Sequence, residues 1–244
     1  MQKTKENKSG FTISDNDVPS EGQMRNSTTT CFLGNESAPH RLLIVGNSIT
    51  RHGPKDDIGW SHDFGMAASC AECDYVHLLT SRLMADEDIL VMVRQFASWE
   101  RSYKEATTKE YYTPEFSFGA DEVIFRLGEN VSLKSDEEEA DFALAIREFL
   151  DNICPEGTKI YFTTCFWKNE RVDRAICQVA EEMQMPLIDL GDLGLYDENM
   201  AIGLFWHGGV AHHPGDLGMQ RIAERLYRAM REPSHPEKPC SEKI

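Results

Sequence analysis

Two side chains that lie far apart in the sequence could together carry out nucleophilic catalysis. Ser48 follows an unbroken apolar run, Leu42 to Val45, that is closed by Gly46. Such a run is typical of a strand that is buried on both faces of a parallel sheet. Open α/β sheets bind their ligands at the carboxyl ends of their strands, so a hydroxyl in this place is a candidate nucleophile. Taken alone, a serine after a strand is more often a turn residue or a helix cap.

A histidine-rich segment near the other end of the chain supplies a candidate base for that hydroxyl. It holds His207, His212 and His213. Serine is a weak nucleophile unless a neighbouring group takes its proton, and imidazole titrates in the right range. Pro214 biases His213 away from the helical conformation, which makes His213 the favoured base. His207 and His212 are candidates for lining the pocket. We predict no metal site, because no set of carboxylates accompanies the three histidines.

Alternating strands and helices must position these side chains. Parallel strands joined through helices form right-handed βαβ units and a sheet that is covered on both faces. The pattern therefore predicts an α/β fold, a three-layer α/β/α sandwich with a central five-stranded parallel sheet of the flavodoxin-like type. The expected strands are 42–45, 89–93, 122–127, 159–164 and 186–190, and the expected helices are 75–84, 135–150, 172–183 and 217–230.

The carboxyl ends of the expected strands define one rim of this sheet. Ala97 follows the second strand, Asn130 the third and Trp167 the fourth. Ser48 and the segment that holds His213 belong to the same rim, so we expect all of these residues around one pocket. Trp167 is accordingly a candidate for lining it.

A long loop, residues 51–73, leaves directly from the candidate nucleophile. Loops of this length inside a compact domain are usually functional or disordered, and this one would form a wall of the pocket. Trp60, Asp63 and Gly65 are therefore candidates for lining it. Trp60 could face an acyl group or a sugar ring, or it could pin the loop to the core, because aromatic side chains dominate packing generally.

The two ends of the chain differ in composition from its middle. Residues 1–40 are polar and hold too few large apolar side chains to offset the entropy of ordering them. We predict a flexible or weakly attached extension there, with a short hairpin of 11–13 with 31–33 as an open alternative. Residues 41–232 form the predicted domain. Residues 233–244 form a polar tail that holds all three prolines after residue 232.

Composition and charge argue against several kinds of partner. The formal net charge of −16 disfavours nucleic acid and anionic membrane surfaces, since both attract basic patches. No apolar run approaches the roughly 20 residues of a membrane span, and the amino-terminal segment lacks the apolar core of a secretory signal, so we expect a cytoplasmic protein. The seven scattered cysteines fit reduced thiols better than a disulfide framework, and Cys70 with Cys73 gives too few ligands for structural zinc.

Four short blocks, taken in order, resemble those of the SGNH hydrolases, the GDSL esterase and lipase superfamily. Gly46-Asn47-Ser48-Ile49 resembles the nucleophile block, with Asn47 in place of the usual Asp. Ala97 aligns with a glycine whose amide faces the oxyanion, and Gly128-Glu129-Asn130 matches Gly-x-Asn, with Val131 in place of the following Asp. His213-Pro214 matches the histidine block before the last helix. The four blocks span residues 41 to 230, nearly the whole predicted domain.

This resemblance implies a serine esterase that acts on small acyl esters, most plausibly acetyl groups on carbohydrate. Ser48 would be the nucleophile and His213 the base, with the amides of Ser48 and Ala97 and the side chain of Asn130 as oxyanion donors and with no cofactor. The acid expected three residues before the histidine is Val210, so either a backbone carbonyl or another carboxylate must orient His213. Asp216 is close, but it is better explained as a helix cap.

Two other functions compete with the esterase. A module that keeps the fold and binds a ligand without catalysis would also fit Val210 at the acid position. A flavodoxin-like nucleotide or response domain is disfavoured, because no glycine-rich phosphate loop follows the first strand. The expected partner is a small-molecule ester, and the sequence gives no oligomeric state.

Overall fold

A six-stranded sheet forms the centre of the protein in the computed structural model, which describes residues 5–6, 12–13, 26–27, 29–105 and 109–231. The strands are β3 (Thr30–Gly34), β4 (His40–Gly46), β5 (Ile89–Gln95), β6 (Glu122–Arg126), β7 (Lys159–Thr163) and β8 (Leu187–Ile188). They run in the order β3-β5-β4-β6-β7-β8. All neighbours are parallel except β3, which is antiparallel to β5.

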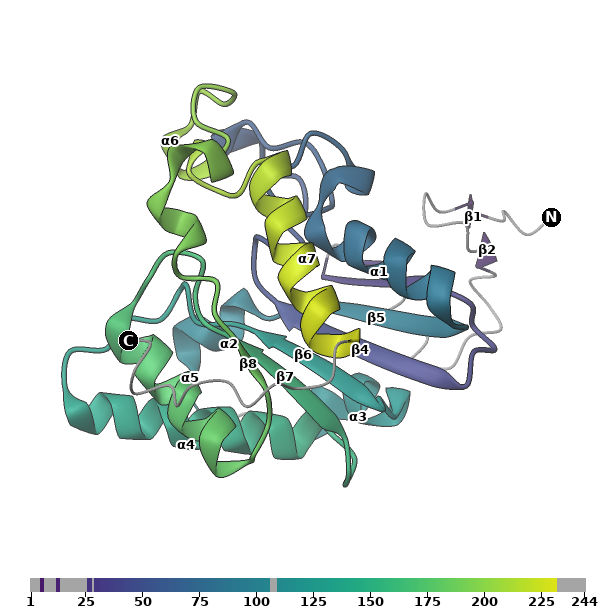
Figure 1. Ribbon diagram of the computed structural model, residues 1–244, viewed down its shortest axis with the longest axis vertical. Coiled ribbons are helices and arrows are strands. Elements are labelled where there is room, and N and C mark those ends of the chain that lie inside the picture. The colour runs from purple at the N-terminus through teal and green to yellow at the C-terminus, as the bar shows by residue number, and fades with distance from the viewer. Residues whose placement is uncertain (1–4, 7–11, 14–25, 28, 106–108, 232–244) are drawn as a thin grey trace.

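Long helices cover both faces of this sheet, as Figure 1 shows, so the predicted three-layer sandwich is confirmed. Helices α1 (Tyr75–Asp86) and α7 (Asp216–Arg231) lie on one face, and α4 (Asp136–Ile153) and α5 (Glu170–Glu182) lie on the other. The central position of β4 explains why apolar and polar residues do not alternate along it. Leu42 and Ile44 pack in the core under α1 and α7, whereas Leu43 and Val45 pack in the core against α4 and α5. All four are fully buried.

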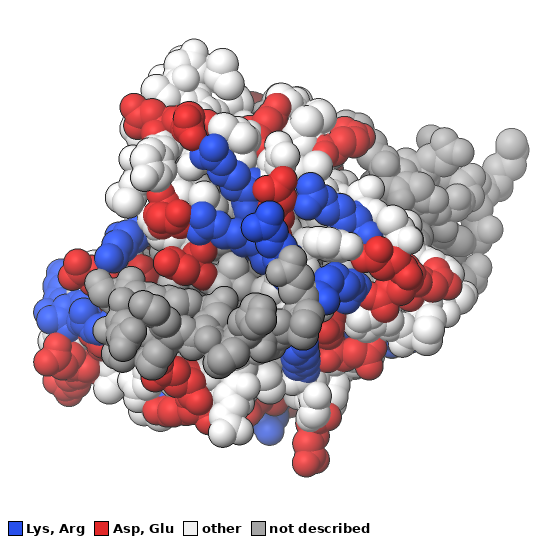
Figure 2. All heavy atoms as spheres, viewed as in Figure 1, with Lys and Arg blue, Asp and Glu red and all other residues white. Residues whose placement is uncertain are grey.

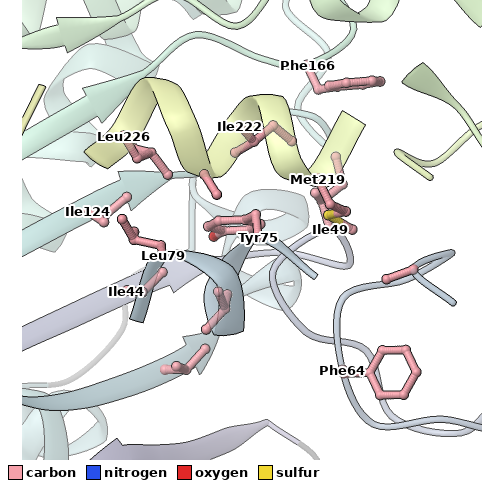
Figure 3. Packing of buried hydrophobic residues seen from close by; sticks show 14 of the residues in the cluster. Ile44, Ile49, Phe64, Tyr75, Leu79, Ile124, Phe166, Met219, Ile222 and Leu226 are labelled. Atoms are coloured by element: carbon pink, nitrogen blue, oxygen red, sulfur yellow. The ribbon is translucent and has the colours of Figure 1, made fainter. Parts of the chain in front are cut away.

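The core under α7 ties the ends of two critical segments together (Figure 3). Ile49, one residue after Ser48, and Met219, six residues after His213, belong to the same buried cluster. Gly65 lies against both of them, since a Cβ at this glycine would come within 2.7 Å of the Ile49 carbonyl oxygen and 3.0 Å of Met219 Cε. Burial of these side chains therefore fixes the two candidate catalytic segments relative to each other.

The sixth strand lies within residues 1–40, where a flexible or weakly attached extension is predicted, and shows that Thr30–Gly34 belongs to the central sheet. β3 pairs along its length with β5, from Thr30 opposite Arg94 to Gly34 opposite Leu90. The hairpin of 11–13 with 31–33, which the sequence left open, is not formed, because β2 (Thr12–Ile13) pairs with β1 (Lys5–Glu6). Most of residues 1–25 and the predicted tail at 233–244 lie outside the described residues.

Shorter elements connect these layers. The short α-helices are α2 (Ala97–Ser102), α3 (Thr113–Phe118) and α6 (Gly208–Ala211), and the 3-10 helices are η2 (Asp56–Ile58), η3 (Ala71–Cys73), η4 (Lys109–Tyr112), η5 (Leu193–Leu195) and η6 (Asp197–Asn199). Among the described residues, no helix is both long enough and apolar enough to cross a bilayer. Five of the cysteines carry free thiols, but Cys177 is disulfide-bonded, so the expectation of reduced thiols is wrong there. A cytoplasmic location stays a prediction.

Candidate active site

The turn after β4 presents Ser48 at the carboxyl edge of the sheet. The backbone amides of Thr50 and Arg51 both donate to the Asn47 carbonyl oxygen, at 3.0 Å each. A Cβ at Gly46 would overlap the Thr50 hydroxyl, so this tight turn requires glycine at the strand end. Asn47 is fully buried, whereas Ser48 is partly exposed. The turn therefore points the Ser48 hydroxyl away from the core.

His213 reaches this hydroxyl from the connection between α6 and α7. Its Nε2 atom lies 2.8 Å from Ser48 Oγ. The His213 carbonyl oxygen accepts a hydrogen bond from the Ala201 amide at 3.0 Å, which holds the backbone of the connection. The edge of the Trp167 ring approaches the imidazole, with 5.2 Å between ring centroids. The fold thus brings together two groups that are 165 residues apart in the sequence.

A backbone carbonyl holds the far side of the imidazole. His213 Nδ1 lies 2.6 Å from the carbonyl oxygen of Gly209, in the last turn before the histidine. That carbonyl can only accept, so the proton must be on Nδ1 and the lone pair on Nε2, which is the tautomer that accepts from a serine hydroxyl. The carboxylate of Asp216 instead accepts from the amide and the hydroxyl of Ser69, at 2.8 and 2.7 Å. Of the two alternatives left open by Val210, the structure contains the carbonyl.

The other two segments of the rim meet beside the nucleophile turn. The Phe96 amide donates to the Gly46 carbonyl oxygen at 2.7 Å, so Ala97, the first residue of α2, follows directly. Asn130 is held from both ends of its side chain. Its Nδ2 donates to Glu100 Oε2 at 2.5 Å, and its Oδ1 accepts from Arg101 Nη2 at 3.1 Å. The amide of Ala97 lies 3.4 Å from Gln95 Oε1, a long contact that leaves this donor weakly engaged.

A buried polar network behind the turn explains the asparagine in the nucleophile block. Asn47 Nδ2 donates to Glu100 Oε1 at 3.0 Å and to Glu129 Oε2 at 2.5 Å, while Asn47 Oδ1 accepts from Arg126 Nη1 at 3.0 Å. An aspartate here would face two carboxylates and could donate to neither when ionised. An amide satisfies all three partners. The neighbours, rather than the turn itself, therefore require Asn47.

Glu100 accepts three hydrogen bonds in this network, among the described residues. It is 1% exposed, and one of these bonds comes from the Gly128 amide at 2.5 Å. Burial raises the pKa of the Glu100 carboxyl, and the nearby negative charge of Glu129 raises it further. Arg126 pairs with Glu129 and supplies the buried positive charge. Sequence reasoning missed Glu100 and Arg126; the only signal was a charge at the end of the apolar strand β6.

Comparison with known proteins identifies the architecture. No protein-family model matches the chain, and no curated protein matches it. A putative GDSL-like lipase from Bacteroides ovatus is similar in structure, with a TM-score of 0.51 and 13% identity over 80% of this chain and 99% of that one. The chain has the same fold as this GDSL-like lipase. TesA gives a TM-score of 0.49 and 16% identity over 79% and 98% of the two chains. The acetyl xylan esterase AlAXEase gives 0.47 and 17% over 78% and 98%.

Within this fold, the loop residues proposed to line the pocket have mainly structural contacts. Trp60 is 1% exposed, donates from Nε1 to the His52 carbonyl oxygen at 3.0 Å and packs edge-on against Phe64. It pins the loop to the core, so its assignment to the pocket is corrected. Gly65 is also buried, and its amide donates to Asp74 Oδ2 at 2.9 Å. Asp63 is exposed enough to meet solvent and lies 3.7 Å from Arg51.

The two other histidines of the segment that holds His213 do not bond to Ser48. His212 is exposed, and its Nδ1 lies 2.6 Å from the Gly208 carbonyl oxygen. His207 lies against Gly209, since a Cβ at that glycine would come within 2.9 Å of its ring. Trp167 does line the site, through its contact with His213. Among the described residues, no group of three His, Cys, Asp or Glu side chains could hold a metal ion.

Burial sets the proton affinity of the candidate base. Desolvation lowers the pKa of His213 to about 4, the Gly209 carbonyl acts in the opposite direction, and the positive charges of His52 and Arg126 lower it further. A neutral imidazole is the form that can accept the serine proton. The base is therefore ready over the whole neutral range.

We predict that any Ser48-dependent activity stays on its plateau well below the ordinary histidine pKa of 6.5 and falls only as the pH approaches about 4. The stability of the fold also falls as the pH drops below 6.5, because the unfolded chain binds this proton first. Circular dichroism at each pH separates the two effects. An acidic limb centred near pH 6.5 in a fully folded sample would contradict the assignment.

Proposed function

We propose that the chain is a serine esterase that hydrolyses small acyl esters, acetyl esters foremost, through a Ser48–His213 dyad. The observation that carries the proposal is the 2.8 Å contact between Ser48 Oγ and His213 Nε2 at the carboxyl edge of the sheet. A nucleophile within hydrogen-bond reach of a base, with the base oriented by a third group, is the arrangement that acyl transfer needs. Here the third group is the Gly209 carbonyl.

The proposed reaction has two halves. Ser48 Oγ attacks the ester carbonyl carbon while His213 Nε2 takes the hydroxyl proton, and His213 then gives that proton to the leaving alcohol. In the second half, water attacks the acyl-serine, with His213 again the base, and the acid is released. Negative charge on the carbonyl oxygen would be met by the amides of Ser48 and Ala97 and by Asn130 Nδ2, each such donor typically contributing ~3 kcal/mol.

Because a backbone carbonyl orients His213, we expect the Ser48–His213 dyad to be a weaker catalyst than a complete Ser-His-Asp triad. The Gly209 oxygen fixes the tautomer and the ring position, as an aspartate would, but it carries no full negative charge to stabilise the imidazolium. We therefore expect a slow or specialised esterase rather than a fast one. The proposal that the alcohol half is a carbohydrate is consistent with Trp206, an aromatic side chain beside His207 that is 74% exposed and lies over Gly59.

Hydrolysis of p-nitrophenyl acetate tests the proposal. The wild-type protein should release p-nitrophenol over many turnovers. With Ser48→Ala, the rate of release should fall to that of uncatalysed hydrolysis in buffer. Ser48 is partly exposed and its side chain bonds to His213 among the described residues, so the variant should fold normally. Equal rates for wild type and Ser48→Ala would leave a ligand-binding module with the SGNH fold as the better account.

A further inference from the structure

Arg101 stands at the edge of the candidate site with its guanidinium exposed. It follows Glu100 on the short helix α2, and both side chains form hydrogen bonds to the side chain of Asn130. Glu100 accepts from Asn130 Nδ2, and Arg101 donates to Asn130 Oδ1 at 3.1 Å. One Nη2 proton is used in this bond, and a guanidinium has five. Most of its donors therefore face solvent beside the predicted oxyanion donor.

The surroundings of Arg101 differ from those of the arginines on α7. Arg221, Arg225 and Arg231 each pair with a carboxylate, from Glu198, Asp192 and Glu87. Figure 2 shows basic and acidic side chains interspersed over this face of the molecule. Arg101 forms no ion pair with a carboxylate of the described residues. The chain has 41 acidic and 25 basic residues, yet this exposed guanidinium beside Asn130 stays open to an external anion.

Arg101 also acts on the charge of a histidine near the candidate site. Burial is the main reason that the pKa of His52 is lowered, and the positive charges of Lys55 and Arg101 add to it. His52 is in turn one of the positive neighbours that lower the pKa of His213. Arg101 therefore lies close enough to the candidate site to act electrostatically on His52.

We propose that Arg101 is a specificity residue that binds a carboxylate or phosphate group on the alcohol half of the ester substrate. This inference rests on the proposed esterase function. Because the expected acyl group is small, a charged group must belong to the alcohol half. The chain of hydrogen bonds from Arg101 through Asn130 to a bound carbonyl oxygen places that anion roughly 5 to 8 Å from the reacting carbonyl. A guanidinium fork matches both kinds of oxyanion group.

The competing explanation is that Arg101 only holds the Asn130 side chain in position through its hydrogen bond. In that case its loss would impair the hydrolysis of neutral and anionic esters alike. The ratio of their rates separates the two explanations, because only a direct contact with the anion makes the ratio depend on Arg101.

A matched pair of acetates measures this ratio. 4-Acetoxybenzoate carries a carboxylate on its alcohol half at neutral pH, and methyl 4-acetoxybenzoate is its neutral counterpart. Values of kcat/KM are taken for both esters with wild type and Arg101→Gln, which keeps an amide donor near Asn130 but removes the charge. Arg228→Gln is the control, because it removes an exposed positive charge from the last turn of α7, away from the site.

Wild type should prefer the anionic ester, and Arg101→Gln should lower the anionic-to-neutral ratio of kcat/KM about tenfold, mainly through KM. Arg228→Gln should keep the wild-type ratio. The preference should also shrink as salt is raised, since the guanidinium is exposed. An unchanged ratio in Arg101→Gln overturns the inference, even if both rates fall. Failure of wild type to hydrolyse either ester would overturn the proposed function instead.

Discussion

Replacing His213 with alanine is expected to abolish nearly all turnover of p-nitrophenyl acetate, with kcat lower by about three orders of magnitude. Among the described residues, His213 Nε2 is the base within hydrogen-bond distance of the Ser48 hydroxyl. Without that base, the hydroxyl must lose its proton to water. Ser48 and His213 act as one unit, so the double variant Ser48→Ala/His213→Ala should be no slower than either single variant.

The adjacent His212 offers a matched control for this experiment. Like His213, it has its Nδ1 against a carbonyl oxygen of α6, but its ring is exposed and has no contact with Ser48. We expect His212→Ala to retain kcat within about threefold, the range of an ordinary surface change. Additive losses in the double variant, or equal losses in His212→Ala and His213→Ala, would show that His213 is not the base.

Replacing Glu100 with alanine is expected to lower both activity and stability. The substitution leaves three donors without their acceptor: Asn47 Nδ2, the Gly128 amide and Asn130 Nδ2. Each unsatisfied buried donor costs about 1 to 3 kcal/mol, and Arg126 keeps its partner Glu129, so we expect a loss of about 3 to 5 kcal/mol in the free energy of unfolding. The turnover number should also fall about a hundredfold, because the Asn130 side chain loses the contact with Glu100 that positions it as an oxyanion donor.

Urea unfolding and steady-state kinetics measure these two effects separately. Asn130→Ala removes the predicted oxyanion donor but leaves the other bonds of Glu100 in place, so it should lose activity with a smaller loss of stability. Glu156→Ala is the surface control, since Glu156 is exposed in the turn before β7. A Glu100→Ala protein with the wild-type urea midpoint would contradict the role assigned to the buried network.

Much of the fold could be predicted from local patterns. The apolar run before Ser48 indicates a two-faced buried strand, and β4 indeed packs on both cores. The pairing of β3 could not be predicted, because Thr30–Gly34 lies within a polar stretch and is stabilised by its partner strand. Edge strands depend on tertiary context more than on their own composition.

The candidate site divides in the same way. Ser48 and His213 carry signals in their neighbours, a strand end and a following proline. The group that orients His213 is a backbone carbonyl, which every residue has, so no side-chain pattern could single out Gly209. Glu100 was equally hidden, because an acidic residue on a short helix usually faces solvent. For Trp60 the sequence left two places open, the pocket and the core, and the structure shows it buried in the core.

Covalent labelling tests the central claim most directly. Incubation of the folded protein with a fluorophosphonate, followed by mass spectrometry of peptides, should find one adduct, on Ser48. The same treatment of His213→Ala should give little or no adduct, because the hydroxyl reacts only when the imidazole takes its proton. An adduct on another residue, or labelling of Ser48 that does not depend on His213, would contradict the account.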